Sequence, residues 1–124
     1  EVVRDLAGPL AVSDVARVEI PSALWRKHRR GEVDGDDLRE LIARFEADWD
    51  GDRASEPAFT PISVSPVLLG SATRQVGRHG LRALDGIQLA TALLAAQHLG
   101  SVQFACFDDQ LRLAAQREGL TLIP

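Results

Sequence analysis

The chain has 124 residues, of which 45% are hydrophobic and 26% charged, with one cysteine and a net charge of −4. These values are typical of a soluble globular protein, and we expect a single domain over residues 1–124 with one core. No apolar run approaches the roughly 20 residues that cross a bilayer, and no basic start precedes an apolar stretch, which predicts no membrane partner and no export signal. A single cysteine excludes an internal disulfide and fits a reducing compartment, so we expect a cytoplasmic protein.

The acidic residues are concentrated in one segment. Between Glu32 and Glu56 there are ten acids and three arginines, a balance of −7, which leaves +3 for the rest of the chain. A weakly cationic remainder is compatible with nucleic acid but lacks the strongly basic surface of a dedicated binder.

The first helix is expected directly after a short apolar run, Leu10–Val12. Ser13-Asp14 can cap this helix, and near-helical apolar spacing continues to Arg30. Pro21 should kink the helix or shift its start, because proline lacks a backbone N–H. Gly31 is the expected stop.

A second helix is predicted around Leu38–Trp49, where apolar residues recur at steps of three and four. Asp34 or Asp36 can cap it, since acids suit the positive end of a helix dipole. Phe59–Val64 follows as a short, irregular or edge strand.

The third helix should open at Ser65-Pro66, with serine as the cap and proline in the first turn. Gly77 and Gly80 are expected to bracket a turn. A fourth, alanine- and leucine-rich helix is predicted over Leu84–Leu99, ended by Gly100.

The last predicted elements are a strand, a helix and a closing strand. Val102–Phe107 is almost wholly apolar, as expected for a strand buried on both faces of a parallel sheet. A helix over Gln110–Glu118 and a short strand over Thr121–Ile123 complete the chain. Alternating helices and strands predict an α/β domain with a mainly parallel sheet covered on both sides.

Three acids stand where chemistry is plausible, and each also has a structural interpretation. Asp108 follows a predicted strand, at the end where open parallel sheets bind ligands, but it can equally cap the next helix. Asp85 lies at the start of an apolar helix, as a cap or a metal ligand. Glu19 on the first helix is, taken alone, an ordinary solvated side chain.

The residues around these acids resemble the conserved blocks of PIN domains. Ser13–Glu19 (SDVARVE) is similar to their second block, and Leu84–Ala92 (LDGIQLATA), the most specific stretch, is similar to their third. Phe104–Leu111 (FACFDDQL) is similar to their closing strand–acid–helix block. The order and spacing agree over nearly the whole chain.

This resemblance implies a PIN-like three-layer α/β/α sandwich with a short, mainly parallel sheet. It also implies that Glu19, Asp85 and Asp108 are the catalytic acids and metal ligands, with Asp109 as a secondary ligand. Clustered carboxylates repel each other unless a cation neutralises them, and their oxygens favour Mg²⁺ or Mn²⁺.

The chain departs from the PIN pattern in two places. The usual first strand, which carries an aspartate followed by serine or threonine, is expected before Glu1, because no acid in the chain substitutes for it. Cys106 occupies a position where such domains often have threonine or serine, which weakens the support of the nearby acid.

The function that the resemblance implies is Mg²⁺-dependent endoribonuclease activity of the VapC toxin type. A metal-activated water would hydrolyse the RNA phosphodiester bond. The expected partners are an RNA substrate, a cognate VapB-type antitoxin protein and a second copy of the chain in a homodimer.

The basic residues offer candidate contacts to RNA phosphates. Arg26 and Lys27 belong to the only basic run, which can equally be a solvated helix end. Arg78 and Arg82 lie shortly before Asp85 and can hold an RNA backbone near it. With aromatic residues at only 5%, stacking on bases should not dominate recognition.

Two other interpretations compete with the nuclease. A catalytically degenerate PIN-like module, binding protein or RNA, has the same sequence blocks but lacks the first acid. A phosphoacceptor receiver domain is disfavoured by motif order, since its acid pair follows the first strand whereas Asp108 and Asp109 come near the end.

Overall fold

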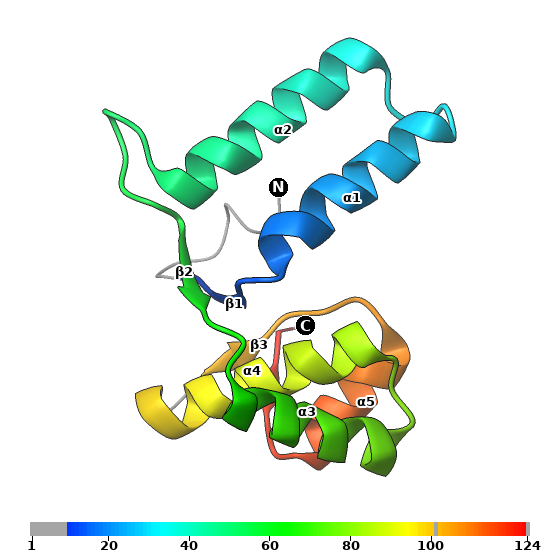
Figure 1. Cartoon of the computed structure of the whole chain (residues 1–124), viewed down its shortest axis with the longest axis vertical. Helices are drawn as coiled ribbons and strands as arrows, with labels where there is room; N and C mark the ends of the chain where they lie inside the picture. Colours follow the sequence, from blue (N-terminus) through cyan, green and yellow to red (C-terminus); the bar gives the residue numbers. More distant parts are fainter. Residues whose placement is uncertain (1–9, 101, 124) are drawn as a thin grey trace. The chain divides into compact units, whose positions relative to one another are not determined.

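The computed structural model describes residues 10–100 and 102–123, which form a mixed α/β structure dominated by helices (Figure 1). The described part of the chain clusters into two compact units, taken separately below. The first unit contains residues 14–61, and the second contains residues 11–13 and 62–123. In chain order the elements are β1 (Leu10–Ser13), α1 (Ala16–Arg29), α2 (Gly35–Asp50), β2 (Phe59–Ile62), α3 (Pro66–His79), α4 (Ala83–Leu99), β3 (Gln103–Phe104), α5 (Asp109–Arg117) and β4 (Thr121–Leu122).

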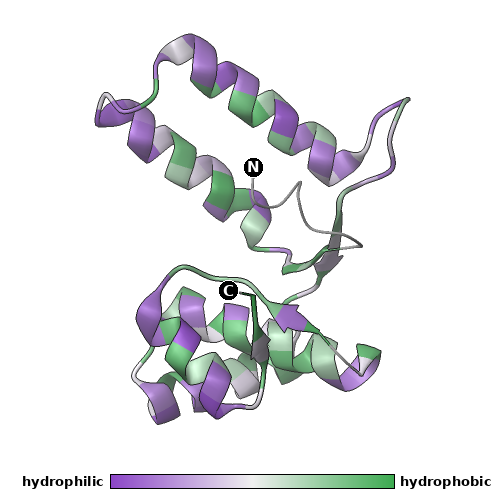
Figure 2. Cartoon of the chain, turned by 180° about the vertical axis from the view of Figure 1, so that it is seen from behind, coloured by the Kyte–Doolittle hydropathy of each residue, from purple (hydrophilic) through white to green (hydrophobic). Residues whose placement is uncertain are grey.

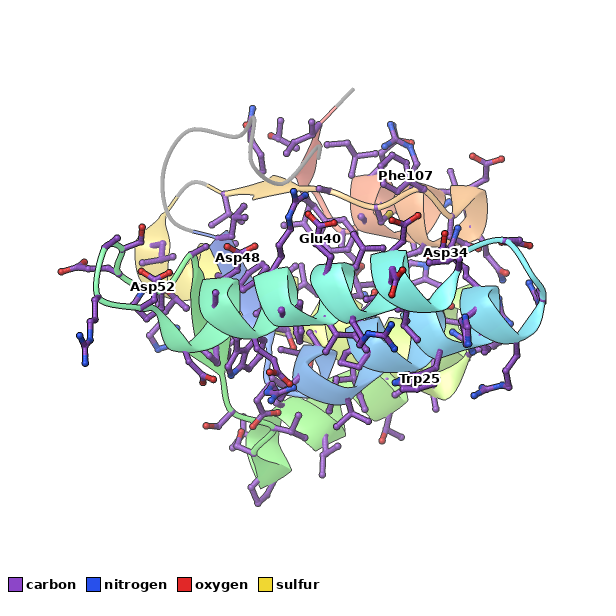
Figure 3. The ribbon with its side chains drawn as sticks, turned by 90° about the horizontal axis from the view of Figure 1, so that it is seen from above. Trp25, Asp34, Glu40, Asp48, Asp52 and Phe107 are labelled. Carbon is purple, nitrogen blue, oxygen red and sulfur yellow. The ribbon has the colours of Figure 1, made fainter. Side chains whose placement is uncertain are left out.

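The first unit is built around the helices α1 and α2, which contact each other. Helix α2 begins after Asp34, whose carboxylate accepts a hydrogen bond from the Asp37 amide at 2.8 Å, as the capping rule predicts. Asp34 is labelled at this end of α2 in Figure 3. Figure 2 shows hydrophilic and hydrophobic stretches alternating along α2, which is the pattern of a helix with one covered side.

An aromatic cluster closes the core of the first unit. The ring of Phe45 lies 5.8 Å from that of Trp49 and 6.1 Å from that of Phe59, and the last two rings are also 5.8 Å apart. Tilted rings at these separations attract one another beyond the area that they bury. Trp49 is half-buried in this cluster, whereas Trp25 is exposed.

The second unit has its core between α3, α4 and α5. Three leucines, Leu68, Leu89 and Leu111, are almost completely buried there, one on each of these helices. Helix α3 begins as predicted, with the Ser65 hydroxyl accepting from the Leu68 amide at 3.2 Å and Pro66 in the first turn. Gly80 ends α3 in the left-handed conformation, with φ +65°, which glycine adopts without strain.

The strands of the described residues pair two by two. β1 pairs with β2, and β3 pairs with β4 in parallel, with Gln103 opposite Thr121 and Phe104 opposite Leu122. The expected α/β class and the parallel pairing near the end of the chain are confirmed.

The predicted buried strand over Val102–Phe107 is wrong in length and burial. Strand β3 covers only Gln103–Phe104, and the side chain of Phe107 is exposed. Arg112 explains the early end: its guanidinium donates to the Cys106 carbonyl at 3.2 Å and to the Ile123 carbonyl at 3.1 Å. The Arg112 side chain thus makes the hydrogen bond to the Cys106 carbonyl that a neighbouring strand would otherwise make.

Two local expectations about turns and caps are also wrong. The N-cap position of α1 is Val15, since Ser13 completes β1, and Pro21 lies inside α1 without shifting its start. Gly77 is not in a turn, because α3 continues to His79. Contacts of the last turn of α3 with Glu118, described below, offset the roughly 1 kcal/mol that glycine costs inside a helix.

Among residues 10–100 and 102–123, no helix combines the length and apolar character that crossing a bilayer requires.

Candidate functional site

Asp85 lies in the first turn of α4, in the second unit. Its side chain is 25% exposed, and Arg82 Nε lies 3.9 Å from its Oδ2 atom. Arg82 itself is 88% exposed, so water screens this ion pair and leaves it weak. Asp85 also lies at the positive end of α4, where the helix dipole favours a negative charge.

Asp108 is the N-cap of α5. Its Oδ1 atom accepts a hydrogen bond from the Leu111 amide at 2.8 Å, so the capping interpretation is confirmed. A carboxylate has a second oxygen, and capping therefore leaves chemistry at the same side chain feasible. Asp109, the expected secondary ligand, is exposed as the first residue of α5.

Cys106 links the two acids electrostatically. Burial raises the pKa of its thiol, the charge of Arg112 opposes this, and the carboxylates of Asp108 and Asp85 both raise the pKa further. Both acids are therefore near enough to act on one sulfur atom, although 23 positions separate them in the chain. Asp85 and Asp108, two of the three acids that the sequence singles out, both belong to the second unit.

Glu19 belongs to the first unit, as the fourth residue of α1, and its side chain is half-buried. The two predicted RNA contacts of this unit, Arg26 and Lys27, lie in the exposed last turn of the same helix. Lys27 Nζ is 3.9 Å from Glu32, an exposed and weak pair that leaves the lysine accessible to a phosphate.

Arg78, predicted to contact RNA, is engaged within the second unit. Its guanidinium donates to both carboxylate oxygens of Glu118 at 3.0 Å. Gln75 donates to the same carboxylate at 3.0 Å, and His79 Nε2 lies 3.5 Å from it. Arg78 is therefore first a structural partner of Glu118, while Arg82 projects into solvent.

Sequence reasoning missed this polar cluster around Glu118. Gln75 and Arg78 lie 43 and 40 positions before Glu118, and each residue has an ordinary local context. Burial of Glu118 raises its pKa, but hydrogen bonds from Gln75 and Arg78, the charge of Arg78 and the contact with His79 outweigh this and lower the pKa below its usual value.

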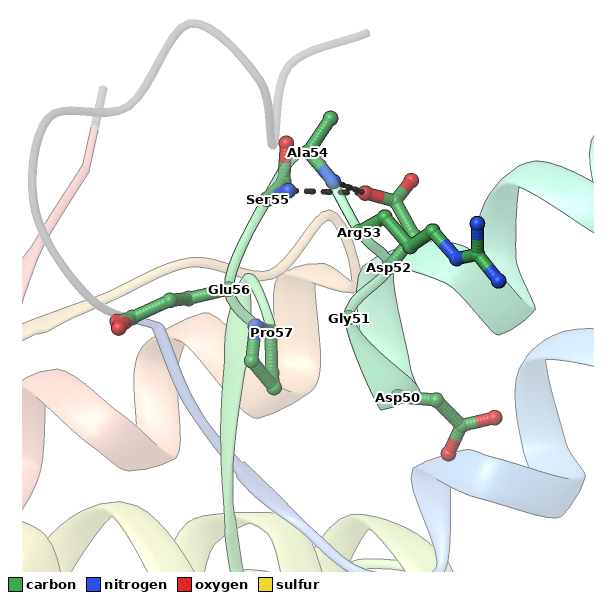
Figure 4. A pocket seen from close by; sticks show the side chains of 8 residues that line it. All are labelled: Asp50, Gly51, Asp52, Arg53, Ala54, Ser55, Glu56 and Pro57. Carbon is green, nitrogen blue, oxygen red and sulfur yellow. Dashed lines mark hydrogen bonds between the residues drawn. The ribbon is translucent and has the colours of Figure 1, made fainter.

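Two surface hollows lie in the first unit. One is formed by a single loop, residues 50–57, in which Asp52 accepts hydrogen bonds from the Ala54 and Ser55 amides at 2.8 Å (Figure 4). The other lies between α1 and α2, beside Trp25 and Leu38. Neither is lined by a predicted site residue.

The donor chemistry of Asp85 and Asp108 fits a hard divalent cation, because carboxylate oxygens are the ligands that Mg²⁺ and Mn²⁺ prefer. Two carboxylates are too few to complete the coordination of a metal ion with protein ligands alone. Among residues 10–100 and 102–123, no three acids, histidines or cysteines form a metal-binding group. Mg²⁺ is commonly held by one or two carboxylates together with water and substrate oxygens, and two carboxylates suffice for that arrangement.

Comparison with known families adds no assignment: no family model matches the sequence, and no curated protein matches it significantly.

Proposed function

We propose that the chain is a Mg²⁺-dependent endoribonuclease of the PIN type, in which Asp85 and Asp108 hold the metal ion. The observation that carries this proposal is that the carboxylates of Asp85 and Asp108, both in the second unit, each raise the pKa of the Cys106 thiol. Both lie at helix N-termini, where the helix dipole favours a negatively charged side chain.

A bound Mg²⁺ would lower the pKa of a coordinated water and neutralise charge at the scissile phosphate. The residues of the chain supply the remaining functions. Asp85 and Asp108 orient the ion, and Asp109 lies beside them as an outer carboxylate. The exposed Arg82 can contact an RNA phosphate, because its pairing with Asp85 is weak. Glu19 enters the proposal through the resemblance to PIN domains alone.

The same resemblance extends the proposal to fold and partners. A PIN-like three-layer sandwich, a homodimer, a VapB-type antitoxin and a cytoplasmic location follow from it as further expectations. The competing function is a PIN-like module that binds RNA or protein without cutting.

The test is cleavage of a structured RNA pool with Mg²⁺ or Mn²⁺, and again with a chelator. Asp85→Asn should abolish the cutting, because the amide keeps the shape of the side chain but loses its charge. Asp36→Asn, at an exposed position of α2, is the matched control and should cut normally. Folded wild-type protein that neither cuts RNA nor binds Mn²⁺ would refute the nuclease and favour the binding module.

A further inference from the structure

The side chain of Phe107 points outward from the segment that precedes α5. Along this segment Gln103 and Ala105 are exposed, whereas Phe104 and Cys106 are half-buried. Extended backbone turns successive side chains to opposite sides, so Phe107 falls on the exposed side. Its exposed fraction is 88%, the highest of the large hydrophobic residues in the described part of the chain. Figure 3 labels Phe107 beside α5.

This exposure sets Phe107 apart from the other phenylalanines. Phe45 and Phe59 are buried in the aromatic cluster of the first unit, and Phe104 packs against the core of the second. A ring that remains in water contributes little to the free energy of unfolding, because the hydrophobic effect rewards only buried surface. Folding of the second unit therefore gives no reason for an aromatic side chain at position 107.

The place of Phe107 relative to the candidate site supplies a reason. It directly precedes Asp108, and consecutive Cα atoms are only about 3.8 Å apart. The acids are thus flanked by an exposed arginine, Arg82, and by an exposed aromatic ring. A phosphate held near the acids brings its own base within reach of that ring.

We propose that Phe107 stacks on a base of single-stranded RNA, next to the phosphate that Asp85 and Asp108 receive. The proposal rests on the ribonuclease function above and adds a substrate contact to it. Stacking uses the face that every base has, so it tolerates many sequences. The exposed neighbours Gln103, Asp109 and Gln110 are polar, which suits a base with polar edges better than an apolar protein surface.

The test measures binding without cleavage. Single-stranded RNA 12-mers of random sequence, with the fluorescent base 2-aminopurine at the centre, are titrated with the full chain in Ca²⁺, a cation that also takes carboxylate and phosphate oxygens as ligands. Wild-type protein should quench the fluorescence, because stacked 2-aminopurine emits weakly. Phe107→Ala should weaken binding by roughly five- to 100-fold, the effect of losing one base–aromatic stack. Phe107→Tyr should retain the quench, whereas Phe107→Leu, which is apolar but has no aromatic face, should lose it.

The control is Leu99→Ala, an exposed apolar residue at the opposite end of α4 from Asp85, which should bind RNA as the wild type does. Unchanged RNA binding by Phe107→Ala, or a quench kept by Phe107→Leu, overturns the stacking proposal. A Tm of Phe107→Ala several degrees below wild type also overturns it, since the ring would then be a packing residue. Cleavage with Mg²⁺ is assayed in parallel. Failure of the stacking proposal then appears as unchanged RNA binding by Phe107→Ala, whereas failure of the ribonuclease proposal appears as no cleavage by the wild type.

Discussion

Arg78 and Glu118 join the end of α3 to the residue that follows α5, with the guanidinium donating to both carboxylate oxygens at 3.0 Å. The Glu118 side chain is only 13% exposed, and His79 beside it is 5% exposed. The carboxylate therefore satisfies the buried side-chain amide of Gln75, which donates to it at 3.0 Å and would otherwise lose its hydrogen bond to water.

Glu118→Gln should lower the free energy of unfolding by about 2 kcal/mol at neutral pH, because it removes charge-assisted hydrogen bonds. Since the folded state lowers the pKa of Glu118, this stabilisation is present above the unfolded pKa and disappears as pH falls through the folded one. Urea unfolding of the wild type and Glu118→Gln between pH 7 and pH 2 measures this difference in the free energy of unfolding. A difference that stays constant down to pH 2 would contradict the lowered pKa.

Gly86→Ala should destabilise the second unit, although alanine favours helices. A Cβ atom at position 86 would lie 2.5 Å from Val76 Cγ2 and 3.2 Å from the Ala72 carbonyl oxygen. Overpacking of this kind costs about 1–3 kcal/mol, more than the helix propensity that alanine adds.

The matched control for that substitution is Gly77→Ala in α3, where nothing lies within 4 Å of the new Cβ. This change should raise the free energy of unfolding by about 0.5–1 kcal/mol, from helix propensity alone. Adding Val76→Ala to Gly86→Ala should recover part of the loss. Thermal unfolding of the wild type, Gly86→Ala, Gly86→Ala with Val76→Ala, and Gly77→Ala tests these predictions. Stabilisation by Gly86→Ala would disprove the close approach of α3 and α4.

Asp85→Asn should make Cys106 more reactive toward iodoacetamide near pH 8. Burial raises the pKa of the thiol first, and the Asp85 carboxylate adds to this, so its removal increases the thiolate fraction. Mass spectrometry measures the alkylation rate of Cys106. Asp36→Asn is the comparison and should react at the wild-type rate. Equal rates in wild type and Asp85→Asn would separate Asp85 from the thiol and remove the main support for the proposed site.

Two substitutions of Asp108 distinguish its capping role from its proposed metal role. Asparagine caps helices as well as aspartate, so Asp108→Asn should leave the Tm close to wild type, whereas Asp108→Ala should cost about 1 kcal/mol. Both should lose metal-dependent RNA cleavage. An Asp108→Asn protein that still cuts RNA would reduce Asp108 to a cap.

The sequence by itself determined the elements whose signals are local. Asp34, Ser65 and Gly100 mark helix ends because capping depends on one side chain or one glycine and the backbone within a turn of it. The spacing of apolar residues located α2, and the alanine- and leucine-rich composition located α4. The blocks around Asp85 and Asp108 also singled out two acids that both raise the pKa of the Cys106 thiol.

Only the tertiary structure decided what depends on partners distant in sequence. Strand β3 ends early because Arg112 reaches the Cys106 carbonyl, and α3 passes through Gly77 because its last turn is held by Glu118. The exposure of Phe107 likewise depends on which side of residues 103–107 packs against the core of the second unit. Such contacts have no signature in composition or spacing, because each residue has an ordinary local context until folding brings its partner to it.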